Sequence, residues 1–148
     1  MRVANEILIP ELARLLHEGK EVRFMPSGVS MRPFIEGDKD SVILSPVTRP
    51  RRGDIILAQV ATPDNRIIYV LHRLIRIDDG IYVLQGDGNL TGEEHCRKED
   101  IIGRVTKIET PSGHGKPLTR GLLWHALLPV RRYLLKLYRH TWLTWRYR

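Results

Sequence analysis

The sequence predicts a mainly β fold: a compact, coiled, mostly antiparallel sheet with a short N-terminal helix and a basic helical C-terminal tail. Short apolar runs separated by turn residues extend from Val22 to Ile108, which is typical of strands. Helical periodicity precedes this stretch, and a basic segment rich in leucine and tryptophan follows it. With 148 residues, of which 42% are hydrophobic, the chain is expected to form one domain with its own core.

The N-terminal helix is predicted from apolar residues that recur on one face. These residues are Ile7, Leu8, Leu12, Leu15 and Leu16. Gly19 follows as a stop signal, so residues 4–18 are expected to be a short amphipathic helix. Charged residues interrupt the apolar pattern of residues 1–24, which is not the pattern of a cleavable targeting segment. No apolar run approaches the roughly 18 residues that a membrane-spanning helix needs.

The predicted strands are apolar runs that turn residues separate. They include residues 41–44, 54–60, 67–77, 81–84 and 101–108. Glycine, proline, asparagine and aspartate stand between them. The Asp79-Gly80 pair between two of these runs indicates a hairpin turn.

The chain is expected to have three parts: a β-domain with its helix over residues 1–109, a linker over 110–120 and a basic amphipathic helical tail over 121–148. Pro129 is expected to start or kink the second segment of the tail. After it, an apolar face is predicted to contain Val130, Leu134, Leu137 and Tyr138. This face either lies in an anionic membrane interface or docks on the β-domain or a partner helix.

Charge and cysteine content narrow the class of protein. A net charge of +7 and a pI near 9.9 favour an acidic partner surface, but no recognition motif accompanies the charge, which argues against nucleic acid. The single cysteine, Cys96, excludes an internal disulfide framework. Its acidic neighbours Glu93 and Glu94 would raise the thiol pKa, so Cys96 is a poor candidate nucleophile. The histidines show no metal-ligand spacing.

A candidate nucleophile lies in the segment from Pro26 to Pro33, which reads Pro-Ser-Gly-Val-Ser-Met-Arg-Pro. Gly28 allows a substrate to approach the backbone closely, and Pro33 stiffens the end of the turn, so the Ser30 hydroxyl could be held for attack. Met31 could cover an apolar wall beside it. Taken alone, an ordinary turn serine is an equally good interpretation.

Further blocks follow this turn in a fixed order. They are Arg-Gly-Asp-Ile-Ile at 52–56, Tyr-Val-Leu-His-Arg-Leu at 69–74, Gln-Gly-Asp-Gly-Asn at 85–89 and Ile-Ile-Gly-Arg-Val at 101–105. Together with the serine turn, the series resembles the signal-peptidase and LexA-like superfamily of serine peptidases over about residues 22–108. The resemblance implies that family's β-fold and a Ser-Met-x-Pro nucleophile box at Ser30. It also implies endopeptidase activity, for which we expect neither a metal nor an organic cofactor.

His72 is the predicted general base. A serine hydroxyl needs a base within hydrogen-bond reach, and on a strand His72 would share a face with Val70 and Leu74 that could look into a cleft beside Ser30. The resemblance also implies this role, because the position carries lysine in bacterial signal peptidases and histidine in the endoplasmic-reticulum type. The alternative is a satisfied structural or surface histidine.

The resemblance implies that an acid follows the Gly-Asp-Gly-Asn turn by a few residues. Glu93 is the closest positional match and Asp87 is the second candidate, although a turn aspartate often bonds only its own backbone. A dyad without an acid is also open. The Ser30 N–H would meet the oxyanion. The second donor stays open, because Gly28 stands where bacterial signal peptidases can carry a serine, and the nearest serine is Ser27.

The predicted function is therefore a serine endopeptidase that cleaves a peptide or leader segment through Ser30 and His72. We expect the substrate to bind as an extended strand on an exposed sheet edge, and the resemblance implies small residues beside the scissile bond. The alternatives are a LexA-like self-cleaving regulator and an inactive peptide-binding module of the same fold. The expected location is cytoplasmic, free or peripheral at a membrane.

Overall fold

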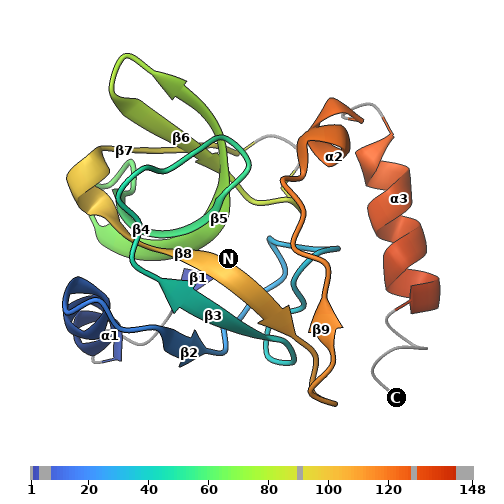
Figure 1. The fold of residues 1–148 in the computed structure, drawn as a ribbon. Coiled ribbons are helices and arrows are strands. Elements are labelled where there is room, and N and C mark those ends of the chain that lie inside the picture. The colour runs from blue at the N-terminus through green and yellow to red at the C-terminus, as the bar shows by residue number, and fades with distance from the viewer. Residues whose placement is uncertain (1, 4–7, 90–91, 128–129, 143–148) are drawn as a thin grey trace.

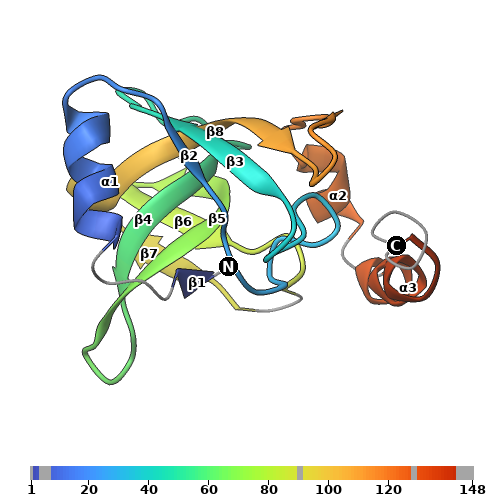
Figure 2. The ribbon, with the colours of Figure 1, turned by 90° about the horizontal axis from the view of Figure 1, so that it is seen from below.

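The computed structural model describes residues 2–3, 8–89, 92–127 and 130–142. Its strands belong to one antiparallel sheet that curls on itself, with α1 (Leu8–His17) at one end of the molecule. The helices α2 (Leu122–Ala126) and α3 (Arg131–Leu137) lie at the opposite end (Figures 1 and 2). The prediction of a mainly β chain with an antiparallel sheet is confirmed.

The strands follow the order β2-β3-β8-β4-β5-β6-β7, while β1 pairs with β5 and β9 pairs with β8. Their bounds are β1 (Arg2–Val3), β2 (Val22–Phe24), β3 (Ser41–Ser45), β4 (Ile55–Ala61), β5 (Ile67–Asp78), β6 (Ile81–Gln85), β7 (Glu94–Cys96), β8 (Ile101–Glu109) and β9 (Gly115–Lys116). A short 3-10 turn, η1 (Lys98–Asp100), precedes β8, and a π-helical turn, η2 (Tyr138–Trp142), follows α3. Each of the five strands given bounds from the sequence matches a strand to within one residue at each end.

The β5–β6 hairpin closes as the sequence predicts. Asp78 pairs with Ile81, and the two residues between them have positive φ, 49° at Asp79 and 77° at Gly80. Positive φ at both central residues is the geometry of a type I′ turn, whose twist matches that of the paired strands.

Two apolar clusters lie on opposite faces of the sheet because side chains alternate along each strand. The first includes Ile55, Leu57 and Leu71 with three residues of α1, namely Ile9, Leu12 and Leu16. The predicted helix is confirmed over α1, and its expected start at residues 4–7 lies outside the described residues. The second cluster contains Ile56, Ala58, Val60, Val70, Leu74, Leu84 and Cys96.

Residues 110–120, which their composition predicts to be a linker, make ordered contacts with the β-domain. Within them β9 pairs with β8, and the buried ammonium of Lys116 forms an ion pair with the buried carboxylate of Asp40. The Arg73 guanidinium donates a hydrogen bond to the Thr119 carbonyl oxygen. Because an unpaired buried charge is costly, Asp40 ties this segment to the domain.

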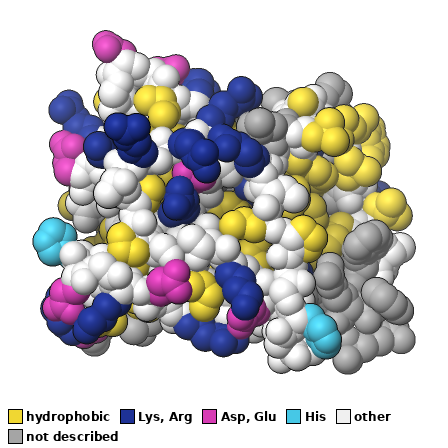
Figure 3. Space-filling view, in the orientation of Figure 1, with side chains coloured by type: hydrophobic (Ala, Val, Ile, Leu, Met, Phe, Trp, Pro, Cys, Tyr) yellow, Lys and Arg dark blue, Asp and Glu magenta, His cyan; other side chains and the backbone are white. Residues whose placement is uncertain are grey.

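The C-terminal segment is partly docked and partly exposed. Trp124, Arg131 and Tyr138 are buried, whereas Leu123 is 76% exposed, Tyr133 68% and Leu137 56%. Figure 3 shows hydrophobic side chains gathered over α2 and α3, beside Lys and Arg side chains on the middle of the same face. Pro129 lies outside the described residues.

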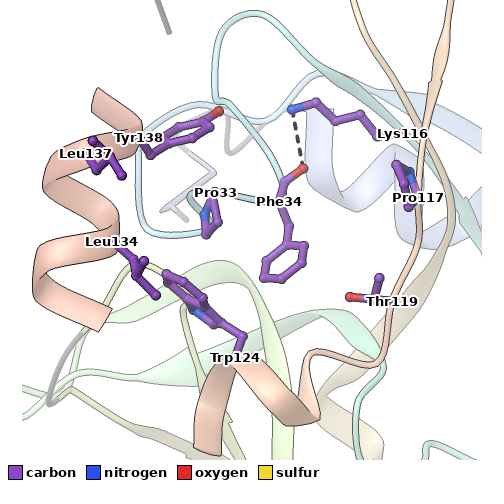
Figure 4. Close-up of a pocket in the computed structure, with 9 residues that line it drawn as sticks. All are labelled: Pro33, Phe34, Lys116, Pro117, Thr119, Trp124, Leu134, Leu137 and Tyr138. Carbon is purple, nitrogen blue, oxygen red and sulfur yellow. Dashed lines mark hydrogen bonds between the residues drawn. The ribbon is translucent and has the colours of Figure 1, made fainter. Parts of the chain in front are cut away.

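An apolar hollow of about 420 Å³ separates α3 from the body of the protein. Leu134, Leu137 and Tyr138 line it from the helix, and Pro33, Phe34 and Trp124 line it from the domain side (Figure 4). Three of the four residues predicted to share a face, Leu134, Leu137 and Tyr138, are therefore turned toward the domain, whereas Val130 does not line the hollow and is 43% exposed. Among the described helices, none is long and apolar enough to cross a bilayer.

Glycine at position 37 is required by a close crossing of two backbone segments. A Cβ at Gly37 would overlap the backbone of Gly28, whereas a Cβ at Gly80 would meet no atom. We therefore expect Gly37→Ala to lower the free energy of unfolding by roughly 3 kcal/mol or more, as overpacking against fixed backbone does. Gly80→Ala carries only the strain of positive φ, about 1 kcal/mol. Chemical denaturation measures both, and similar losses in the two variants would contradict the crossing.

Candidate active site

The predicted nucleophile lies at the start of a tight turn. Arg32 N–H donates to the Val29 carbonyl, and the N–H groups of Phe34 and Ile35 donate to the Met31 carbonyl, so the chain turns sharply after Ser30. The Met31 side chain is fully buried in the first apolar cluster. The turn is thus anchored from inside the core, leaving the Ser30 hydroxyl free to face the other way.

A second turn supports Ser30 from behind. The Gly88 N–H donates to the Ser30 carbonyl at 2.7 Å, and a Cβ added at Gly86 would collide with that same carbonyl. Glycine is therefore needed in the Gly-Asp-Gly-Asn turn for close approach of two backbones.

Ser30 and His72 are in contact. The Ser30 Oγ lies 3.0 Å from His72 Nε2, well within the range of about 4 Å that we expect for a nucleophile and its base. His72 pairs with Ile56 across β4 and β5, on the face of the second apolar cluster, where Val70 and Leu74 also lie. The expected face and the expected contact are both confirmed.

The acid beside His72 is Glu94. Its Oε2 lies 2.8 Å from His72 Nδ1, on the opposite side of the ring from Ser30. An ionised carboxylate can only accept, so Nδ1 carries the proton and Nε2 presents a lone pair to the Ser30 hydroxyl. This is the tautomer that a general base requires.

Glu93, the first candidate for the acid, does not contact His72. Its carboxylate forms an ion pair with Arg76 at 2.9 Å, and that pairing lowers the Glu93 pKa. The reason for the one-residue difference is strand alternation. Glu94 pairs with Leu84 and Leu84 with Leu74, which puts Glu94 on the His72 face of the sheet.

Asp87, the second candidate, is also directed elsewhere. It is fully buried and forms an ion pair with Arg73, whose Nη2 lies 2.7 Å from Asp87 Oδ2. Arg73 follows His72 on β5, so its side chain leaves the opposite face of the strand. Asp87 therefore stabilises the turn behind Ser30 and does not orient the His72 ring.

Burial sets the protonation of His72. Its side chain is 4% exposed, and desolvation lowers its pKa below the ordinary 6.5, an effect that the hydrogen bond donated to Glu94 partly opposes. The imidazole is therefore neutral at pH 7 and able to accept a proton. Burial and Asp100 raise the pKa of Cys96 to about 11, which keeps that thiol protonated.

A developing oxyanion could meet the Ser30 N–H, which makes no backbone hydrogen bond among the described residues. Gly28, with φ of 93°, holds the chain in the left-handed region two residues before the nucleophile. This conformation favours glycine and leaves no side-chain donor at that position.

Sequence reasoning missed Glu94 and the partners of Asp87. The three-residue strand β7 alternates between half-buried Glu94, exposed His95 and buried Cys96. That alternation would have identified Glu94, but a run this short after Gly92 is not recognisable as a strand. The contacts of Asp87 with Trp124 and His125 could not be predicted, because no motif around these residues indicates that they meet.

Comparison of the chain with protein-family models, with curated proteins and with solved structures found no match. The arrangement of side chains is therefore the main ground for a functional assignment.

Titration of His72 tests the assignment of the acid. We expect a midpoint below 6.5 in the unmodified protein, and a lower one in Glu94→Gln, because the carboxylate favours the charged imidazole. Glu93→Gln serves as the matched control and should leave the midpoint in place. NMR of the imidazole resonances measures all three, and an equal shift in both variants would contradict the assignment.

Proposed function

We propose that this protein is a serine endopeptidase with a fold of the signal-peptidase and LexA-like type. The proposal rests on two contacts of one imidazole ring. Ser30 Oγ lies 3.0 Å from His72 Nε2, and Glu94 Oε2 lies 2.8 Å from His72 Nδ1. A hydroxyl, a neutral imidazole and a carboxylate in this order form the arrangement that activates serine for acyl transfer.

In the proposed reaction, His72 Nε2 takes the hydroxyl proton as Ser30 Oγ attacks the scissile carbonyl. The Ser30 N–H stabilises the resulting oxyanion, and Glu94 stabilises the imidazolium without taking its proton. His72 then protonates the leaving amine, so the peptide C–N bond breaks and an acyl-enzyme remains. Water, deprotonated by the same imidazole, hydrolyses the ester and restores the Ser30 hydroxyl.

An extended peptide is the substrate class that the sheet favours. The edge of β5 that faces away from β4 is paired with β6 from Arg73 onward and with β1 at Tyr69 and Val70. Because β1 pairs there in the antiparallel direction, this edge of β5 can accept an antiparallel strand close to His72. A substrate strand at the same edge would displace β1, and main-chain hydrogen bonds would replace those that β1 makes.

Replacement of the proposed dyad tests the activity. We expect Ser30→Ala and His72→Ala each to reduce hydrolysis of a peptide library, read by mass spectrometry, by about 10⁴-fold or more. The double variant should lose little further, because the two residues act as a unit. Glu94→Gln should cost less than either, and Glu93→Gln should be neutral. A folded protein that binds peptides without cleaving them would instead be an inactive peptide-binding module.

The proposed partner of the C-terminal segment is an anionic membrane surface. Residues 121–148 contain six Lys or Arg residues and no Asp or Glu, and this segment exposes Leu123, Val130 and Tyr133, none of which lines the hollow. Arg51, Arg104 and Arg120 line a cleft close to the start of α2. Apolar side chains bordered by basic ones match the chemistry of an anionic lipid interface.

Vesicle binding tests this partner. We expect salt-sensitive co-sedimentation with anionic vesicles and a loss of about tenfold or more when Leu123, Val130 and Tyr133 are changed to Ser together. Ile77→Ser is the matched control, since Ile77 is an exposed apolar residue on a distant hairpin. Point variants are preferable to removal of the tail because Trp124 is buried against the domain.

Two outcomes would contradict the membrane proposal. One is equal sedimentation of the triple variant and the unmodified protein. The other is self-association through this face, seen as a concentration-dependent mass in light scattering that the triple variant abolishes.

A further inference from the structure

Asp87 is a buried centre of polar contacts immediately behind the nucleophile. Its two carboxylate oxygens accept from Arg73 at 3.1 and 2.7 Å, and Oδ1 also lies 2.8 Å from His125 Nε2. Its carbonyl accepts from Trp124 Nε1 at 2.7 Å, and its N–H lies 3.4 Å from Met31 Sδ. Every polar group of Asp87 thus has a partner, and two of these partners come from α2.

The proton on His125 is placed by its second contact. His125 Nδ1 lies 3.4 Å from Nη1 of Arg131, which is fully buried. A guanidinium only donates, so Nδ1 accepts and Nε2 carries the proton toward Asp87. Oδ1 therefore receives hydrogen bonds from two donors on different parts of the chain.

Trp124 also contacts the serine turn directly. Its ring meets the ring of Phe34 edge to face, with centroids 6.0 Å apart and an interplanar angle of 84°. Phe34 in turn lies under the Arg73 guanidinium, 5.1 Å from ring centroid to Cζ. Trp124 and His125 therefore both hold the turn behind Ser30 through Asp87, and Trp124 also holds the serine turn through Phe34.

We propose that Trp124 and His125 are positioning residues for Ser30, so that the C-terminal segment completes the active site. The connection runs from α2 to the carbonyl and carboxylate of Asp87, and from Gly88 N–H to the Ser30 carbonyl. This inference rests on the proposed endopeptidase function for its kinetic consequence. The positioning itself is a property of the fold.

The physical reason is the cost of a buried polar group without a partner. If the Trp124 N–H is removed, the Asp87 carbonyl stays buried and must find water or move. Movement of this turn shifts Ser30, and a misplacement of about 1 Å can reduce a rate by 10²-fold. The effect should therefore appear in the rate constant of the chemical step more than in KM.

The test compares the rate at which a fluorophosphonate labels Ser30 in four variants of the full chain. Trp124→Phe keeps the ring and removes the donor, and His125→Ala removes the second donor. His125→Gln restores an N–H near the position of Nε2, and His17→Ala is the control, an exposed histidine at the end of α1. We expect Trp124→Phe and His125→Ala to slow labelling by about 5- to 100-fold, His125→Gln to recover part of the rate and the control to match the unmodified protein.

Hydrogen exchange at the Gly88 amide, which bonds Ser30, separates this claim from the proposed function. Faster exchange in Trp124→Phe and His125→Ala supports positioning even if fluorophosphonate never labels the unmodified protein, a result that would defeat the endopeptidase proposal alone. Unchanged exchange and unchanged labelling in both folded variants would overturn the positioning role.

Discussion

Side-chain alternation along β5 is the constraint on which the rest of the site depends. Consecutive residues of a strand face opposite ways, so His72 is directed to Ser30 and Glu94 while Arg73 is directed to Asp87. One face thus carries the proposed chemistry, and the other carries the ion pair that fixes the turn behind the nucleophile. A shift of register by one residue would exchange the two and remove both functions.

The Arg73–Asp87 pair has the properties of a structural element. The Arg73 side chain is 1% exposed and the Asp87 side chain is fully buried. Removal of one partner from such a pair typically lowers the free energy of unfolding by about 3–5 kcal/mol. Arg73 also donates to the carbonyls of Gly53 and Thr119, so its charge is satisfied from several segments. These bonds connect the residues before β4, the segment before α2 and the turn behind Ser30 that contains Asp87. The segment before α2 and α2 itself are therefore packed against the domain, which is one of the placements that the sequence leaves open for the C-terminal part of the chain.

Elements with a regular local pattern of apolar and turn residues were predicted correctly from the sequence. The long strands, α1 and the Asp79-Gly80 hairpin follow from local patterns. The Ser30–His72 contact was expected from the order of the motifs and the family resemblance that they imply, because the serine turn alone has no specific signature. Glu94 was missed because its face depends on β6 pairing with a three-residue strand. The partners of Asp87 were missed because contacts across 38 residues, such as that with His125, leave no trace in local spacing. Short elements and long-range polar contacts are set by tertiary packing, which a single sequence does not display.

The most direct measurement is the position at which a fluorophosphonate modifies the intact, folded protein at neutral pH. Mass spectrometry of the whole chain and of its fragments would show one adduct on Ser30, and none in His72→Ala, because the hydroxyl needs the neutral imidazole to accept its proton. The chain also contains Ser27, three residues before the proposed nucleophile. An adduct on Ser27, or an unmodified Ser30 in the folded protein, would contradict the account.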